Sequence, residues 1–227
     1  MFVVAAILAT RLVEPRLDSI KVTVKNVFRQ NLAGLTELFQ SMRTTRITLQ
    51  LAVIGAGYVI AANILGASQA REYGMDARGT GWIFGVGCLM SVLASRLYPR
   101  LRVAVGEKWL VITTAMMMLA SFLVARYVGL GVGVVLIVMR IASSSIFRNT
   151  RSVIVNKWIS SGNRATTLST LNLLTQTPYM FLAPLFGMMI DQTSPNQFAW
   201  MLGLGIVGVL GITSLLVNRQ RIATIQS

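Results

Sequence analysis

The chain lacks histidine, has a single cysteine, and contains only 7 acidic residues among 227. The missing histidine excludes catalysis, metal binding and proton relay by imidazole groups of this chain. The lone Cys88 excludes an internal disulfide, and its place in an apolar block predicts a small core residue. No Asp or Glu lies at mid-depth in an apolar block, so the sequence identifies no coupling ion. We therefore expect no enzyme, no metal site and no cofactor.

Charged residues of both signs are scarce. They make up 12% of the chain, 54% of the residues are hydrophobic, and the mean hydropathy is +0.66. Soluble domains carry about twice that share of charge. The apolar residues form six blocks of about 20 residues, the length that a helix needs to cross a bilayer. This pattern predicts an all-α, polytopic membrane bundle with six transmembrane helices, at residues 47–67, 79–98, 109–127, 130–150, 166–190 and 198–217.

The remaining stretches divide the chain further. Residues 1–14 are apolar but too short to span, and we expect them to be the end of a truncated transmembrane helix. Residues 15–46 form a basic linker, 47–217 the six-helix domain, and 218–227 a tail. In the linker, apolar residues at helical spacing predict an amphipathic helix, which lies on the membrane surface or packs on helix ends. These residues are Phe28, Leu32, Leu35, Phe39 and Met42. A turn of about two residues near Gly129 predicts a tight hairpin between the third and fourth spans.

The basic residues predict the orientation. Of 21 Lys and Arg residues, 17 fall on one side of the predicted membrane and three, Arg71, Arg78 and Arg126, on the other. The positive-inside rule then places the linker and the C-terminus in the cytoplasm of a multi-pass protein of the cell (inner) membrane. The net charge of +14 does not indicate a nucleic-acid partner, because the cations lie between apolar blocks.

Arg140 is the remaining cation and lies inside a predicted span. Burying it there costs at least about 2.5–3.5 kcal/mol, so it needs water or a partner. One interpretation is a pathway cation that meets a polar or anionic solute. The other is a structural arginine that pairs with a helix carbonyl or with a carboxylate from elsewhere.

Other polar residues at depth suggest a path through the bundle. Tyr58 and Asn63 lie at depth in the first span, and they either line this path or bond across a helix pair. Pro178 and Pro184 in the fifth span predict a hinge. Four polar residues of that span share one helix face, and their number favours a cavity lining. These residues are Ser169, Asn172, Gln176 and Tyr179.

Several apolar blocks contain glycines at short spacings. Such series predict close helix contacts rather than nucleotide-binding loops, because they lie inside long apolar runs. The series are Gly55/Gly57, Gly81/Gly85 and Gly203/Gly205/Gly208/Gly211.

One segment at the start of the fifth predicted span is similar to the R-A-T-x-x-S segment that opens the eleventh helix in many transporters of the major facilitator superfamily. It reads Asn163-Arg164-Ala165-Thr166-Thr167-Leu168-Ser169 and is followed by Gly187 and Asp191. Over essentially its whole length the chain resembles the C-terminal half of such a protein, helices seven to twelve. The resemblance implies a cavity lined by the seventh, eighth, tenth and eleventh helices. It implies substrate-pathway roles for Tyr58, Asn63, Arg140, Asn172, Gln176 and Tyr179.

The function expected from this resemblance is secondary active transport of a small organic solute or drug. The expected partners are the lipid bilayer, that solute, and the missing N-terminal six-helix half, from the same gene or a separate chain. One alternative is a non-transporting fragment or a half-subunit. A second is a lipid-binding membrane subunit that uses the basic linker. A membrane enzyme is disfavoured, because the sequence offers no catalytic cluster.

Overall fold

The computed structural model describes residues 32, 34–159 and 164–225, and all regular structure there is helical, which confirms the all-α prediction. Several predicted features lie outside these residues: the helix end at 1–14, the linker up to residue 31, which includes Phe28, the residue Asn163, and residues 226–227 of the tail. The elements are α3 (Met42–Ile60), η1 (Ala61–Leu65), α4 (Gly66–Glu72), α5 (Ala77–Val105), α6 (Glu107–Leu123), η2 (Ala125–Tyr127), α7 (Leu130–Asn156), α8 (Arg164–Gln192) and α9 (Pro195–Ile225).

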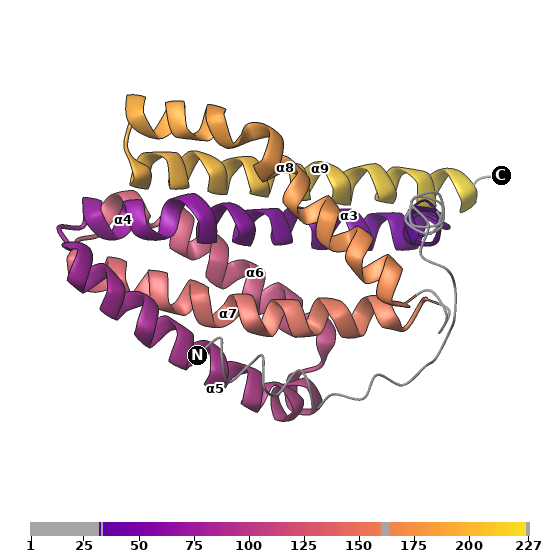
Figure 1. Ribbon diagram of the computed structural model, residues 1–227. Helices are drawn as coiled ribbons and strands as arrows, with labels where there is room; N and C mark the ends of the chain where they lie inside the picture. The colour runs from indigo at the N-terminus through magenta and orange to yellow at the C-terminus, as the bar shows by residue number, and fades with distance from the viewer. Residues whose placement is uncertain (1–31, 33, 160–163, 226–227) are drawn as a thin grey trace, which may run out of the picture.

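The central element is the continuous run formed by α3, the π-helical turn η1 and α4 (Figure 1). It starts at a capping box: the Ser41 hydroxyl accepts from the Thr44 amide at 3.2 Å, and the Thr44 hydroxyl accepts from the Ser41 amide at 3.0 Å. The predicted amphipathic helix of the linker does not continue into α3, because the chain turns at residues 39–41. The first long helix therefore begins at Met42 rather than at residue 47.

The next three helices form a group in which α5 and α6 both pack against α7. The Asp76 side chain caps α5 by accepting from the Gly79 amide at 2.7 Å. The connection between α6 and α7 is longer than the tight hairpin that the sequence predicts. Helix α6 ends at Leu123, and the 3-10 turn Ala125–Tyr127 precedes the start of α7 at Leu130.

Helices α8 and α9 complete the bundle by packing against α3. Helix α8 contains Pro178 and Pro184. Each proline removes one backbone hydrogen bond and weakens the helix locally. Figure 1 shows α8 changing direction along its length, so that its two halves do not share one axis. A bend is therefore present in the helix that carries both prolines, and its movement as a hinge stays a prediction.

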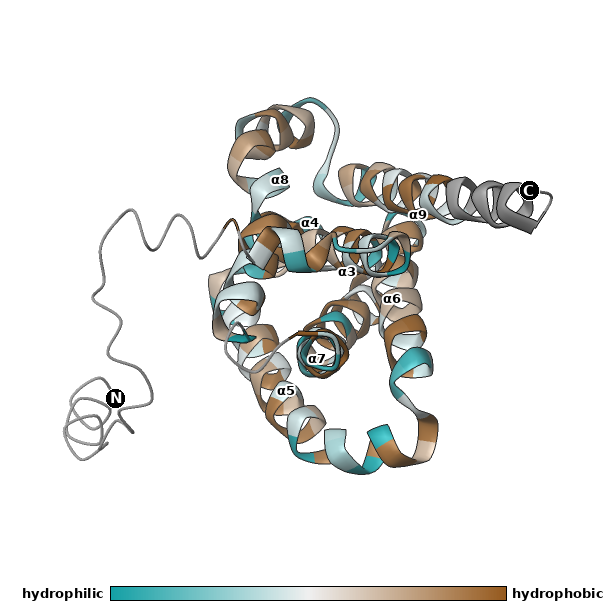
Figure 2. Ribbon diagram, turned by 90° about the vertical axis from the view of Figure 1, so that its right-hand side faces the viewer, coloured by the Kyte–Doolittle hydropathy of each residue, from teal (hydrophilic) through white to brown (hydrophobic). Residues whose placement is uncertain are grey.

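Within the described part of the chain, five helical segments are long and apolar enough to cross a membrane: Met42–Glu72, Ala77–Val105, Leu130–Asn156, Arg164–Gln192 and Pro195–Ser214. The predicted third span corresponds to α6, which has only 17 residues, so six crossings stay a prediction. Much of the outer surface is apolar: Trp82, Leu89 and Phe181 are 70%, 67% and 78% exposed. Figure 2 shows apolar residues in α3, α5, α6, α7 and α9 alike. Such a surface needs lipid or protein to cover it.

The close helix contacts predicted at glycines are confirmed at some positions and wrong at others. A Cβ added to Gly55 of α3 would lie 2.6 Å from Thr175 Cγ2 of α8. Gly203 also packs tightly, since a Cβ added there would lie 3.0 Å from Leu123 Cδ2 of α6. At five others an added Cβ would meet no atom of the described residues within 4 Å, so the contacts predicted there are wrong. These are Gly81, Gly85, Gly205, Gly208 and Gly211.

Candidate functional site: a polar cavity between four helices

Helices α3, α5, α7 and α8, with the adjoining turn η1, surround a cavity of about 1020 Å³, called here the polar cavity. It is lined by Gly55, Tyr58, Val59, Ala62, Asn63, Cys88, Ser91, Val92, Ser95, Ile141, Ser144, Ser145, Phe147, Arg148, Arg151, Asn172, Thr175 and Gln176. Its size matches the upper end of small-molecule sites, which reach about 1,000 Å³. Hydroxyl, amide and guanidinium groups from separate helices meet here, so a solute could be oriented by several polar contacts at once.

Four of the six predicted pathway residues line the polar cavity: Tyr58, Asn63, Asn172 and Gln176. The buried Tyr58 hydroxyl donates to the Thr114 carbonyl at 2.8 Å and lies 2.9 Å from the Ser143 hydroxyl. The exposed Asn63 amide donates to the carbonyl one turn earlier in its own helix, at 2.8 Å. Tyr58 is therefore fixed in the wall, whereas Asn63 and Gln176 present exposed amides.

Arg140 does not line the polar cavity and is only 3% exposed. Its Nη2 donates to Gln69 Oε1 at 2.9 Å, and its Nη1 donates to the Ser121 hydroxyl at 3.5 Å. The guanidinium carbon lies 5.2 Å from the centroid of the Phe122 ring. The partner is thus an amide oxygen rather than the helix carbonyl or carboxylate expected from the sequence. This arrangement favours the structural interpretation of Arg140.

The contacts of Arg140 continue into a buried network. Gln69 of α4 donates from Nε2 to Asn196 Oδ1 of α9 at 3.1 Å. The Asn196 backbone amide in turn donates to Glu72 Oε2 at 2.7 Å. Sequence reasoning missed Gln69 because it lies beyond the predicted end of the first span at residue 67, yet it is 1% exposed. Through these side chains α4, α6, α7 and α9 are held together.

The predicted polar stripe on α8 is divided by the structure. Asn172 and Gln176 line the polar cavity, together with Thr175, whereas Ser169 and Tyr179 do not. Tyr179 is partly buried and packs against the main hydrophobic core. It directly follows a proline, where the loss of a backbone hydrogen bond permits the helix to bend and later residues to face elsewhere. Of the predicted stripe, Asn172 and Gln176 are thus the residues that line the cavity.

Arg148, Arg151 and Cys88 are among the lining residues that the sequence did not predict to be there. Arg148 and Arg151 lie at the end of the predicted fourth span, which stops at residue 150, but α7 continues to Asn156. Their spacing from Ser144, four and seven residues, is that of one helix face and could have indicated a shared lining. The prediction of Cys88 as a core residue is wrong, because Cys88 is exposed and lines the polar cavity.

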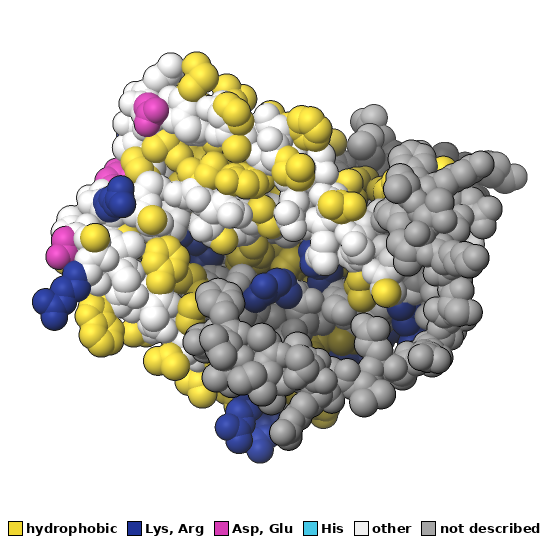
Figure 3. Space-filling view, in the orientation of Figure 1, with side chains coloured by type: hydrophobic (Ala, Val, Ile, Leu, Met, Phe, Trp, Pro, Cys, Tyr) yellow, Lys and Arg dark blue, Asp and Glu magenta, His cyan; other side chains and the backbone are white. Residues whose placement is uncertain are grey.

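The polar cavity is electropositive. Arg148 and Arg151 are the charged residues among those that line it, and none of the described lining residues is Asp or Glu. Arg151 Nη2 donates to Asn172 Oδ1 across the space between α7 and α8. Its Nε is buried and has no hydrogen-bond partner among the described residues. Figure 3 shows Lys and Arg side chains in the central hollow of the molecule and acidic side chains at its left edge.

An ion-pair cluster lies at one end of the bundle, where α5 ends and α6 begins. Glu107 pairs with Lys157, at the end of α7, through Oε2 at 2.5 Å, and with Arg102 of α5 through Oε1 at 2.8 Å. The hydrogen bond from Lys157, aided by that from Arg102, holds the pKa of the Glu107 carboxyl below its usual range. This cluster links three helices on the side predicted to be cytoplasmic.

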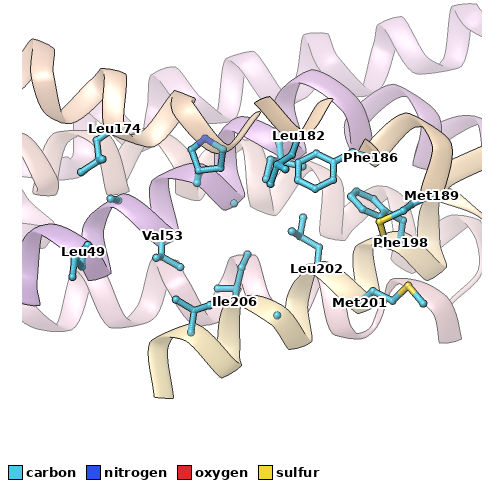
Figure 4. Close-up of a pocket in the computed structure, with 17 residues that line it drawn as sticks. Leu49, Val53, Leu174, Leu182, Phe186, Met189, Phe198, Met201, Leu202 and Ile206 are labelled. Atoms are coloured by element: carbon cyan, nitrogen blue, oxygen red, sulfur yellow. The ribbon is translucent and has the colours of Figure 1, made fainter. Parts of the chain in front are cut away.

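A second cavity, of about 520 Å³, lies between α3, α8 and α9 and is lined by apolar residues and glycine throughout (Figure 4). Figure 4 shows Leu182 and Phe186 of α8 near Phe198 and Leu202 of α9. The rings of Phe186 and Phe198 are 5.3 Å apart between centroids. Because none of the described side chains that line it donates or accepts a hydrogen bond, this cavity could not orient a polar solute.

No protein-family model matches the chain, and no curated protein matches it in sequence. The chemistry of the polar cavity therefore carries the functional conclusion.

Proposed function

We propose that the chain is the C-terminal half of a secondary transporter of the major facilitator type, and that a small organic solute binds in the polar cavity. The observation that carries this proposal is the cavity itself. It is large, polar and positioned between long apolar helices, where exposed polar groups need water or a solute as a partner. A helical bundle needs no such space for stability, because protein interiors are normally close-packed.

The position of the cavity in the helix order also supports the proposal. If α3 is the seventh helix, then α5, α7 and α8 are the eighth, tenth and eleventh. These are the four helices that the resemblance to the major facilitator superfamily implies for the solute cavity. The polar cavity is bounded by these same four elements.

A second six-helix half is part of the proposal. Only 17% of the most apolar window of α5 and 11% of that of α8 are buried, against 61% for Met42–Glu72. Both helices border the polar cavity, so a partner that covers them would also close it. We propose that this partner comes from the same gene or from a separate chain. The cell (inner) membrane and a cytoplasmic C-terminus belong to the same proposal.

The alternatives differ in what they require. A lipid-binding subunit would use the basic linker, most of which lies outside the described residues. A non-transporting fragment would have the cavity without access from both sides of the membrane. The two-sided access of the polar cavity therefore separates a transporter from these alternatives.

Cys88 provides the test, because it is the one cysteine of the chain and lines the polar cavity. In oriented vesicles of native membranes, a polar, membrane-impermeant thiol reagent should reach Cys88 from either side. Its matched control is Leu89→Cys in a Cys88→Ser background, since Leu89 is 67% exposed but does not line the cavity. Reaction from one side only would contradict a transporter, and no reaction from either side would contradict a water-filled cavity.

A further inference from the structure

We propose that the polar cavity selects small organic anions, and that Arg151 is the residue that binds the anionic group. The inference rests on the proposed function and adds the class of solute. It comes from the charges and donors of the lining residues. It gives no role to Arg140, which is sealed in a separate network.

The first observation is the imbalance of charge. Two guanidinium groups, Arg148 and Arg151, line the space, and none of the described residues that line it carries a carboxylate. A cleft lined by charge of one sign and bounded by low-dielectric walls raises the local concentration of counter-ions by about 10-fold or more. A cationic solute would be repelled at the same place.

The second observation concerns the hydrogen bonds of Arg151. Its Nη2 donates to the neutral Asn172 amide oxygen, and its guanidinium carbon lies 5.9 Å from the centroid of the Phe147 ring. Neither partner neutralises the charge. The buried Nε–H lacks an acceptor among the described residues. A guanidinium group whose partners are all neutral keeps its full charge, and guanidinium groups bind carboxylate or phosphate groups in two-point geometry.

The remaining lining groups suit the rest of such a solute. Hydroxyl groups come from Ser91, Ser95 and Ser144, and amides from Asn63 and Gln176. Some of these groups already bond within the bundle: Ser91 donates to the Ile141 carbonyl at 3.0 Å and accepts from Ser145 at 3.0 Å. They can bind neutral polar substituents, whereas the anionic group is left to the arginines.

The test compares two thiol reagents of opposite charge at Cys88. Sulfonatoethyl methanethiosulfonate is an anion and trimethylammonioethyl methanethiosulfonate is a cation. Each rate with the protein is divided by the rate of the same reagent with a small free thiol. We expect the normalised rate of the anion to exceed that of the cation by about 10-fold or more. Arg148→Gln and Arg151→Gln should each lower this ratio, and the double variant should bring it near one.

Two variants control for indirect effects. Arg78→Gln removes an exposed cation of α5 outside the cavity lining and should leave the ratio unchanged. Arg151→Lys keeps the charge and should keep most of the preference. The rate with the neutral reagent N-ethylmaleimide detects a variant that has lost its fold, because that rate would change as well. A wild-type ratio near one, or a ratio unaffected by the double substitution, would overturn the proposal.

The source of the anionic group is tested in two membranes. The same ratio is measured in nanodiscs of phosphatidylcholine and in nanodiscs that contain phosphatidylglycerol. A soluble anion as the natural ligand predicts the preference in both. If anionic lipid abolishes the preference, a lipid headgroup occupies the arginines and the solute proposal fails. If Cys88 reacts with neither reagent, the proposed function fails with it, whereas equal reaction with both removes only the anion selectivity.

Discussion

At the scale of single residues, burial separates the two kinds of arginine in this bundle. Arg140 is enclosed and held by Gln69 and Ser121, whereas Arg151 borders a cavity and retains a donor without a partner among the described residues. A buried cation with fixed neutral partners stabilises one arrangement of helices. A cation beside open space can exchange partners. In the sequence, Arg140 and Arg151 are both arginines in or near an apolar block, and nothing there distinguishes their burial.

The role of Arg140 predicts a loss of stability on substitution. Arg140→Met leaves the buried Gln69 oxygen without its donor, which costs about 1–3 kcal/mol. Arg78→Met, at an exposed site, should change stability by less than about 0.5 kcal/mol. Denaturant unfolding in detergent micelles measures both. An Arg140→Met variant with full stability but an altered charge preference at Cys88 would instead assign Arg140 to the pathway.

Glu107 predicts a dependence of stability on pH. Its pKa is lower in the folded chain than in the unfolded chain, because Lys157 and Arg102 donate to the carboxylate. The stabilisation is therefore complete above the unfolded-state value, about 4.3, and is lost as the pH falls through the folded-state value. Glu107→Gln should lower the Tm at about pH 7, and the difference from wild type should shrink in acid. Asp191→Asn, at an exposed carboxylate, is the control. A difference that persists in acid would exclude the ion pairs as its cause.

At the scale of elements, the contact of α3 with α8 sets one wall of the polar cavity. Gly55 makes this contact possible, because a Cβ there would lie 2.6 Å from Thr175 Cγ2 and 3.3 Å from Arg151 Nη1. Thr175 and Arg151 both line the cavity. The close approach of the two backbones therefore positions the binding groups as well as the helices.

Gly55→Ala is predicted to destabilise the bundle by about 1–3 kcal/mol, because the added methyl group overpacks the interface. Gly81→Ala is its matched control in α5, where the added methyl group meets no described atom within 4 Å. That change should be neutral or stabilising by up to about 1 kcal/mol. Unfolding curves of the two variants test this pair. Equal effects would show that helix propensity, not the contact, determines the result.

The sequence predicted the elements better than their ends, for physical reasons. Apolar runs identify long helices, but a span cut at bilayer thickness ends α7 at residue 150 and hides Arg151 in a loop. The same cut left Gln69 outside the first helix, although α4 extends to Glu72. Cys88 looked like a core residue because hydropathy does not tell which face of an apolar helix meets a cavity. The partner of Arg140 depends on tertiary packing, which no local pattern contains.

At the scale of the whole molecule, the two cavities divide polar from apolar chemistry around α3. The polar cavity lies toward α5, α7 and α8, and the apolar one lies toward α8 and α9. Helix α8 contributes to both, with Gln176 on the polar side and Pro178 on the apolar side. A change in the bend of α8 would therefore alter both cavities together. A helix at an interface that moves during transport would need such a link between the shapes of the two cavities.

The measurement that tests the account most directly is a scan of single cysteines along α5 from residue 88 to residue 95, with a membrane-impermeant thiol reagent. The wild-type chain supplies position 88, and a Cys88→Ser background supplies the others. Positions 88, 91, 92 and 95 line the polar cavity, whereas 89, 90, 93 and 94 do not. A water-filled cavity predicts fast reaction at the first four, the spacing of one helix face, and slow reaction at the others. Uniform reactivity, or fast reaction confined to 89 and 93, would contradict it.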